Sequence, residues 1–199
     1  MSSRDLILSR LRGAGRSPQP LPAVPLFDRD LPPAIDAFKR SLDRVGGVWC
    51  DAPADGDIEA LIRARFPDAR TFCSAVPEVA GTRRIEAVER PHDLNDVDVG
   101  IVRPAFAVAE TGSLYLSERE YRVNALGYLS QHLVALLDPA RIVGNLHHAY
   151  HRSEFFDARY ACLMSGPSAT ADIEGVLIRG AQGVRSLTVI PVPLAGAAR

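Results

Sequence analysis

The sequence predicts an α/β protein built around a mainly parallel β-sheet. Short apolar runs alternate with amphipathic helical segments through the first half of the chain, which is the pattern of βαβ units. Hydrophobic residues make up 47% and charged residues 24% of the 199 residues, the balance of an ordinary globular protein. A chain of this length can bury a proper core, so we expect one principal domain with an appendage.

We expect three parts along the chain: an N-terminal helix with a proline-rich arm, an α/β domain and a frayed tail, at residues 1–30, 31–192 and 193–199. Six prolines lie between residues 17 and 33. Proline fixes φ and removes an amide donor, so this stretch is predicted to run extended over a surface. The arm either packs on its own domain or exchanges with a second subunit to form a homodimer, and the sequence leaves both open.

In the first half we predict a helix, a strand, a second helix and a second strand, at residues 33–46, 48–50, 55–66 and 71–73. Apolar residues recur at three- and four-residue spacing in both helices. Asp55 or Asp57 is expected to start the second helix. Pro67 ends it, because the residue before a proline disfavours the α conformation. Residues 76–96 carry charges of both signs and are expected to form loop and a short helix.

In the second half we predict strands at 106–109 and 114–116, a helix at 122–130, a strand at 133–137, a helix at 146–154, and strands at 160–164, 176–178 and 187–190. Glu110-Thr111-Gly112-Ser113 joins the first two of these strands. This spacing is typical of a hairpin or a sharp strand reversal, with Gly112 supplying a positive φ.

Glu110 is a carboxylate that closes an otherwise apolar strand. Glutamate is rarely buried without a partner, so one interpretation is simply a solvated strand end. The other is a carboxylate held at a sheet edge as a nucleophile or general base. We keep Glu110 as the candidate catalytic residue.

The stretch from Ser165 to Arg185 holds the densest set of breakers, hydroxyls and carboxylates in the chain. Gly166 can act as an N-cap and Pro167 suits a first helical position, so a helix is predicted to begin here. The amides of residues 168–170 would then face a cleft and attract an anion, or the stretch is a plain connection with ordinary caps. Asp172 and Glu174, a little further on, would share one side only if the chain is extended there.

Two other groups of residues, a set of histidines with a glutamate and the three cysteines, contain possible metal ligands, but a structural role fits each group better. His147, His151 and Glu154 would share one face of a continuous helix, but a solvated polar face fits their charged surroundings better, and we assign no metal. The three cysteines are far apart in apolar runs and fit small buried residues at strand ends, at Cys50, Cys73 and Cys162. An iron–sulfur cluster usually needs four thiolates, so this chain is not expected to hold one alone.

Charge and hydropathy exclude two classes of partner. A formal net charge of −1 gives no basic field for nucleic acid. No apolar run approaches the ~20 residues of a membrane span. The N-terminus also lacks the apolar core of a signal peptide, so we expect a cytoplasmic protein.

Five segments of the second half form a recognisable series, at Ala109–Ser113, Gln131–Leu133, Ile142–His147, Ser165–Glu174 and Gly180–Val189. Together they resemble the LUD domain, the family of lactate utilisation protein C. A ten-residue match with four others in the right order is far more specific than a lone glycine-rich motif. In the last segment the family usually reads Gly-x-His-Gly-Pro, whereas this chain has Gln182 and Val184 in place of His and Pro.

The resemblance implies a Rossmann-like sheet with helices on both faces, similar to phosphosugar isomerases and CoA transferases. It also implies an accessory subunit or regulator in the oxidation of L-lactate to pyruvate, binding a small anionic ligand in a cleft. In that system partner proteins carry the iron–sulfur clusters, so no cofactor is expected on this chain. The expected ligand-binding residues are Thr111, Gly112, His132, Asn145, Gly166, Pro167, Ser168, Thr170, Asp172 and Glu174.

Two other functions stay open. The Glu-Thr-Gly turn makes a stand-alone acyl- or CoA-type transferase conceivable, with Glu110 as its nucleophile. The other is a pure scaffold, in which the arm of residues 1–30 makes the contacts.

Overall fold

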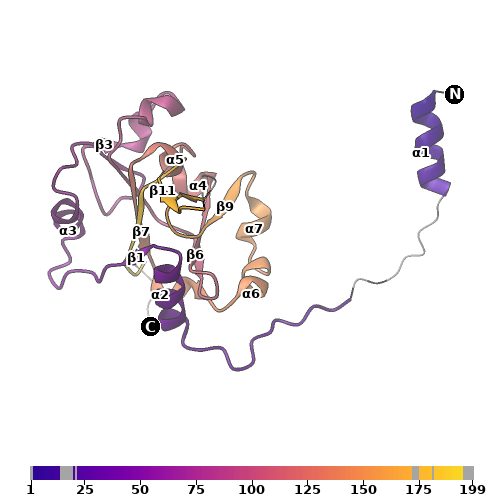
Figure 1. Cartoon of the computed structure of the whole chain (residues 1–199), viewed down its shortest axis with the longest axis horizontal. Helices are drawn as coiled ribbons and strands as arrows, with labels where there is room; N and C mark the ends of the chain where they lie inside the picture. Colours follow the sequence, from indigo (N-terminus) through magenta and orange to yellow (C-terminus); the bar gives the residue numbers. More distant parts are fainter. Residues whose placement is uncertain (1, 14–19, 21, 172–174, 181, 195–199) are drawn as a thin grey trace.

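Six parallel strands form the central sheet of the protein, in the order β1-β12-β7-β4-β2-β3 (Figure 1). Their bounds are Val48–Trp49 for β1, Ser186–Pro191 for β12, Val99–Val102 for β4, His132–Leu137 for β7, Phe72–Ser74 for β2 and Arg83–Arg84 for β3. The computed structural model describes residues 2–13, 20, 22–171, 175–180 and 182–194. The predicted parallel sheet is confirmed.

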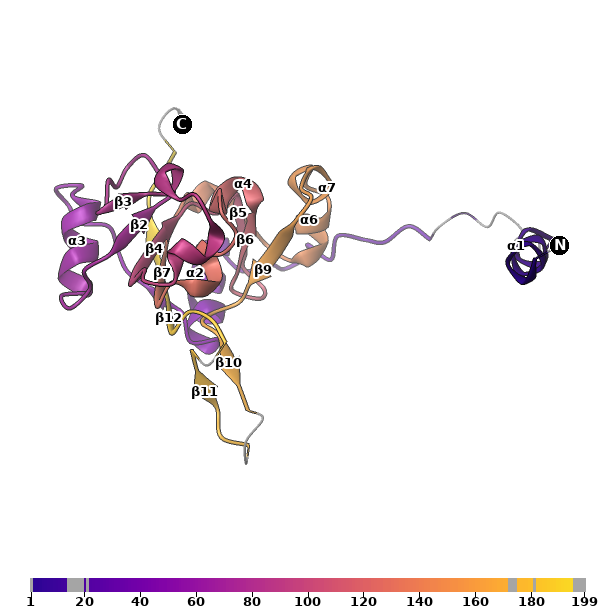
Figure 2. The same ribbon diagram turned by 90° about the horizontal axis from the view of Figure 1, so that it is seen from above.

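Helix α3 (Ile58–Arg65) covers one face of this sheet (Figure 2). Asp57 caps it, its carboxylate accepting a hydrogen bond of 2.9 Å from the amide of Ala60, so the second of the two predicted starting residues is the right one. Ile58 and Ile62 pack from α3 onto apolar side chains of β2, β4, β7 and β12. These side chains alternate with those that face the opposite layer, as the period of two in a strand requires.

The opposite face is covered by α2 (Ala34–Arg44) and by a second sheet. The second sheet has the order β8-β5-β6-β9, with bounds Ile142–Val143, Phe106–Val108, Ser113–Ser117 and Ala161–Met164. Its β5–β6 and β6–β9 pairs are antiparallel and its β5–β8 pair is parallel. Sequence analysis predicted the hairpin but not this sheet layer, because strands buried on both faces read as plain apolar runs.

Two short helices pack on the outside of the second sheet, α6 (Leu146–Tyr150) and α7 (Glu154–Asp157). The predicted continuous helix over 146–154 is therefore wrong. The chain bends between the two helices, where the Arg152 guanidinium lies 4.8 Å from the ring centroid of Phe106 and donates to Glu154 at 2.6 Å. The break between the two helices coincides with this contact.

The remaining short elements lie in the connections. They are α4 (Glu118–Tyr121), α5 (Leu126–Leu129) and the 3₁₀ helices Ile85–Ala87, Pro91–Leu94 and Pro139–Arg141. The helix predicted at 122–130 is confined to α5. Arg122 interrupts the path with φ 61° and ψ −50°, and the amide of Val123 bonds the carbonyl of Tyr121 at 2.7 Å. This is a γ-turn in its rare, strained form.

The chain after β9 does not begin a helix, so that prediction is also wrong. Instead β10 (Ala169–Thr170) pairs antiparallel with β11 (Ile178–Arg179), and Figure 2 shows this ladder projecting from the body. The amide of Ser168 donates to Val184 at 3.0 Å, so it is not an open anion donor. Gly166 has φ +78°, which suits a turn and not the first turn of a helix.

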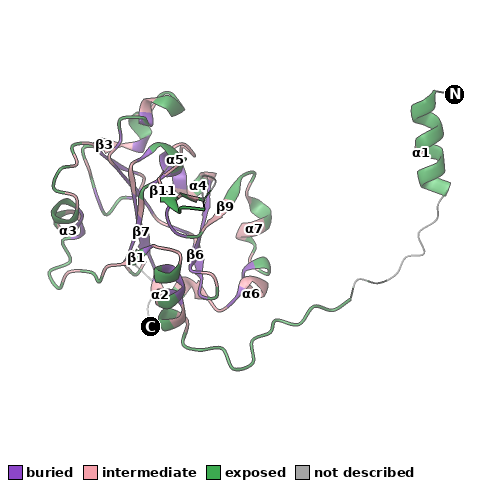
Figure 3. Cartoon of the chain, viewed as in Figure 1, coloured by how far each residue is buried: buried purple, intermediate pink, exposed green. Residues whose placement is uncertain are grey.

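The beginning of the N-terminal arm lies apart from this layered body. Helix α1 (Ser3–Gly13) has no buried residue and stands away from the sheets (Figures 1 and 3). Its apolar side chains face outward, with Leu6, Ile7 and Leu11 exposed by 45%, 58% and 67%. Among the described residues, no helix has both the length and the apolar character needed to cross a membrane.

The single tryptophan of the chain, Trp49, lies where α2 meets β1. Its ring meets Phe38 of α2 edge-on at 6.1 Å, and the ammonium group of Lys39 lies 4.7 Å from its centroid. Its indole N–H donates to Asp51 at 2.7 Å. The side chain thus joins a helix to the edge strand of the parallel sheet.

Candidate functional site

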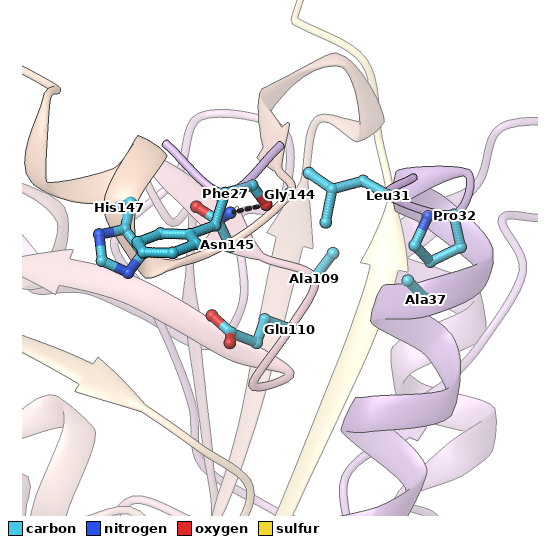
Figure 4. Close-up of a pocket in the computed structure, with 9 residues that line it drawn as sticks. All are labelled: Phe27, Leu31, Pro32, Ala37, Ala109, Glu110, Gly144, Asn145 and His147. Carbon is cyan, nitrogen blue, oxygen red and sulfur yellow. Dashed lines mark hydrogen bonds between the residues drawn. The ribbon is translucent and has the colours of Figure 1, made fainter. Parts of the chain in front are cut away.

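A cavity that includes predicted site residues lies between the arm and the second sheet (Figure 4). We call it the arm pocket; its volume is about 480 Å³. Its lining comes from the arm, the start of α2, the β5–β6 turn and the start of α6, at Phe27, Leu31, Pro32, Ala37, Ala109, Glu110, Gly144, Asn145 and His147. Two predicted site residues, Glu110 and Asn145, therefore meet in one cavity.

Asn145 joins the arm to the body. Its Oδ1 caps α6 by accepting from the amide of His148 at 2.9 Å. Its Nδ2 donates to the carbonyls of Leu26 and Phe27 at 2.7 and 3.2 Å. Asn145 is 4% exposed, and both the oxygen and the nitrogen of its side-chain amide are engaged in these hydrogen bonds. The Phe27 ring then lies 4.7 Å from the His147 ring and closes one side of the pocket (Figure 4).

Glu110 lies in the turn after β5 and points its carboxylate into the arm pocket (Figure 4). One carboxylate oxygen accepts from the amide of Leu146 at 3.1 Å, and the side chain is exposed. Its backbone carbonyl accepts from the Ser41 hydroxyl at 3.1 Å, which fixes the turn to α2. Glu110 is thus both a solvated strand end and a group available to a ligand.

The charge of the arm pocket does not suit a bare anion. Glu110 brings a carboxylate, and the described lining residues include no lysine or arginine. His147 adds an imidazole, and the other walls are mostly aromatic, aliphatic or backbone. Such a lining would hold an apolar body with a hydroxyl or amino group near Glu110.

Gly112 explains why the turn is built as it is. It has φ +67°, as expected from the sequence, and a Cβ there would lie 2.5 Å from the amide nitrogen of Leu42 in α2. Next to it, the hydroxyls of Thr111 and Ser113 lie 2.6 Å apart, and Ser113 is 2.6 Å from Ser165. This hydroxyl chain links the Glu110 turn to the end of β9.

His132 lies elsewhere, at the amino end of β7. Its Nδ1 is 2.8 Å from the Ser186 hydroxyl, and its ring lies 4.9 Å from that of Phe66. Burial lowers the pKa of His132 below its usual range, and the charge of Arg185 adds to this. It lines a separate cavity of about 290 Å³, so the imidazole does not face Glu110.

Gly166, Pro167 and Ser168 line a third cavity, of about 240 Å³, together with Cys162. Gly166 is buried against the carbonyl of Val45 at the end of α2, closer than a Cβ would allow. The two residues that depart from the family pattern line the same cavity, at Gln182 and Val184. Thr170 lies in β10, and Asp172 and Glu174 fall outside the described residues.

The groups with metal-binding potential do not converge. Nowhere in the described ranges do three His, Cys, Asp or Glu side chains come together as a metal site. Glu154 pairs with Arg152 at 2.6 Å and Arg141 at 3.5 Å. Cys73 is buried, which raises the pKa of its thiol to about 11.

Sequence analysis missed the contribution of the arm to the pocket. Phe27 and Leu31 supply much of its apolar wall, whereas the sequence predicts only an extended connector there. The available signal was a Leu-Phe pair within a proline-rich stretch, since a large aromatic residue there has a reason to pack. His147 was noted for metal binding and instead faces Phe27.

The layered arrangement defines a Rossmann-like α/β protein, with a six-stranded parallel sheet flanked by helices. The family model of the LUD domain matches residues 39–192, and the chain belongs to this family. The resemblance inferred from the five sequence segments is thereby confirmed.

Two known proteins are similar to this chain. Lactate utilization protein C of Geobacillus kaustophilus (strain HTA426) is 26% identical over 167 residues, which cover 78% of this chain and 67% of that protein. The crystal structure of a DUF162 family protein from Deinococcus radiodurans matches with a TM-score of 0.60 and 18% identity, over 80% of this chain and 96% of that one. At that identity the second match shows a shared fold.

Proposed function

We propose that this protein takes part in lactate utilisation, as an accessory subunit or regulator of the oxidation of L-lactate to pyruvate. The observation that carries the proposal is the match to lactate utilization protein C, which extends over 78% of this chain. Membership of the LUD family over residues 39–192 supports it. A small anionic ligand in one of the cavities would give the protein a means of sensing the pathway.

The proposal includes iron–sulfur partner proteins in the cytoplasm. Lactate oxidation needs an electron acceptor, and iron–sulfur clusters, usually held by four thiolates, are one class of electron carrier. This chain has three cysteines, of which Cys73 lies in the core. The electron-transfer groups are therefore assigned to partners, and the present chain to assembly or control.

A gene deletion with complementation tests the role. We expect the deletion strain to lose growth on L-lactate, to keep growth on pyruvate, and to recover with the full chain. A tagged full chain purified from lactate-grown cells is expected to carry two proteins with visible iron–sulfur absorbance. Unchanged growth on L-lactate together with a tagged chain free of such partners would overturn the proposal.

One observation favours a second candidate, an acyl or CoA-type transferase: the Glu110 carboxylate is exposed in a cavity of about 480 Å³. In this reaction a carboxylate oxygen of Glu110 attacks the thioester carbonyl. The C–S bond breaks, CoA leaves as the thiolate, and an acyl-glutamyl anhydride remains.

Mass spectrometry after incubation with acetyl-CoA tests this candidate. We expect one acyl group on Glu110, absent in Glu110→Gln and present in Glu89→Gln, which changes an exposed glutamate outside the arm pocket. A wild-type protein that stays unmodified excludes the transferase and leaves the role in lactate oxidation untouched.

A further inference from the structure

A second large cavity, of about 390 Å³, lies at the carboxyl ends of β2 and β4. We call it the basic cavity. Its charged lining residues are Arg103, Arg119, Arg122, Arg141, Glu120 and Glu154. Sequence analysis singled out none of the four arginines, and the arm pocket shares no lining residue with this cavity.

The position of the basic cavity follows from the strand order. The chain passes from β2 outward to β3, whereas from β4 it passes to β7 on the other side. The connections therefore run in opposite directions from the β2–β4 pair, which makes a topological switch point. In open α/β sheets, ligands bind in the crevice outside the carboxyl ends of the strands at such a point. Ala75 follows β2 and Arg103 follows β4, and both line the cavity.

The charge of the lining is positive. Four guanidinium groups face two carboxylates, a surplus of two positive charges in a chain whose formal net charge is −1. Both carboxylates are already engaged. Glu120 accepts from the amide and hydroxyl of Ser117 at 2.7 and 2.6 Å, and Glu154 accepts from Arg152 at 2.6 Å. The field in the crevice therefore favours an anion.

Two of the arginines are held in place by the protein. Arg103 donates to Glu78 at 2.6 Å and to the carbonyl of Val192 at 2.8 Å, and its side chain is 15% exposed. Its Nε is buried with no hydrogen-bond partner among the described residues. Arg141 donates to the carbonyl of Ala105 at 3.2 Å. Fixed guanidinium groups lose little entropy when they bind a ligand.

Arg122 is the free cation of the described lining. Its guanidinium has no ion pair or hydrogen bond with any residue in the part of the chain that the structure describes. Its backbone holds the strained γ-turn, with φ 61°. Strain of this kind persists where the surrounding structure enforces it, and here it falls at an arginine that lines the cavity.

We propose that the basic cavity binds a small-molecule anion through a carboxylate or phosphate group, with Arg122 as the principal contact. The planar guanidinium fork matches both groups by paired, charge-assisted hydrogen bonds. Its volume leaves room for the body of a small metabolite that carries such a group. This proposal stands on the cavity and does not require the role in lactate oxidation.

Titration of the ¹⁵N-labelled full chain, followed by NMR at constant ionic strength, tests the proposal. The probes are pyruvate for a carboxylate and inorganic phosphate for a phosphate. We expect at least one probe to give saturable shifts at the arginine Nε–H groups and at the amides of Ala75 and Ala105. The probe that saturates identifies the anionic group.

Matched variants separate a specific contact from a general effect of charge. Arg122→Gln is expected to weaken binding at least about tenfold, because the charge-assisted hydrogen bonds of the guanidinium are lost. Arg40→Gln removes the same charge from an exposed site on α2 outside the cavity and is expected to bind as wild type. Arg122→Gly relieves the positive φ, so it keeps the fold while it loses the contact. Absence of saturable shifts with both probes, or equal weakening in Arg122→Gln and Arg40→Gln, would overturn the proposal.

Discussion

The arm pocket and the basic cavity are similar in volume, about 480 and 390 Å³, and opposite in charge and construction. The arm pocket combines the Glu110 turn with a proline-rich segment. Asn145 holds this segment by donating hydrogen bonds to two of the segment's backbone carbonyls. The basic cavity is formed at the ends of the strands of the sheet, with Arg103 fixed between β4 and the residue after β12. One cavity therefore depends on an appendage, and the other on the topology of the core.

This difference indicates how each cavity should respond to change. Part of the wall of the arm pocket belongs to the arm, so we expect the shape of the pocket to follow any movement of the arm. Part of the lining of the basic cavity directly follows the buried strands β2 and β4, so we expect that part to be as stable as the fold. An adjustable pocket suits a regulatory contact, and a rigid basic crevice suits recognition of a small anion.

The largest expected effect comes from two glycines near the arm pocket. Gly112→Ala forces a Cβ to 2.5 Å from the α2 backbone at φ +67°, and we expect a loss of about 3 kcal/mol in the free energy of unfolding. Gly144→Ala meets the flexible end of Leu31 at 2.6 Å, so a loss below about 1 kcal/mol is expected. Urea unfolding measures both; similar losses would show that the Glu110 turn is not rigidly packed on α2.

The second effect concerns the rigidity of the basic cavity. Arg103→Ala removes the partner of Glu78 and a hydrogen bond to Val192, and we expect it to cost about 2 kcal/mol. Arg119→Ala, at an exposed residue of α4, is expected to cost less than about 0.5 kcal/mol. Equal urea midpoints for the two variants would contradict a cavity anchored through Arg103.

The third effect separates the two roles of Asn145. Asn145→Ala loses the cap of α6 and both bonds to the arm, and about 2 kcal/mol is expected. Asn145→Asp keeps the capping oxygen but no longer donates to Leu26 and Phe27, so hydrogen exchange should rise in the arm while α6 stays protected. Unchanged exchange at residues 26 and 27 would show that other contacts hold the arm.

The smallest effect is a dependence on pH. Hydrogen bonding from Arg152 holds the pKa of Glu154 below its ordinary value of 4.5. The unfolded chain then takes up the proton first, so this carboxylate stabilises the fold above about pH 4.5, and the contribution is lost as the pH falls through the lower folded pKa. Glu154→Gln should be less stable than wild type near pH 6 and close to it near pH 3. If the difference in stability between Glu154→Gln and wild type were the same at both pH values, the ion pair would not be the source of the pH dependence.

The sequence predicted the parallel sheet well, because each buried strand is a short apolar run beside a helix with a clear signal, such as the cap at Asp57. It did not predict the second sheet layer, since apolar runs do not reveal which sheet a strand joins. The predicted helix after β9 is absent because a Gly-Pro pair can form a turn as well as start a helix. Here Gly166 forms a turn, buried against Val45.

The candidate site was predictable where its residues follow one another or cap an element. Glu110 closes a strand and Asn145 caps α6, and both reach the arm pocket. His132 lies away from the arm pocket because of the strand register, which pairs it with Ser186 at the amino ends of the strands. The basic cavity could not be found from spacing, because its arginines come together only through strand order.

The place of Trp49 gives the protein an internal optical probe. Because it is the single tryptophan, its emission reports one location, the contact of α2 with β1. The nearby ammonium of Lys39 and the hydrogen bond to Asp51 should quench or shift that emission in the native state. Fluorescence of the unmodified chain can therefore follow the docking of one helix on the sheet edge, in real time and without a label.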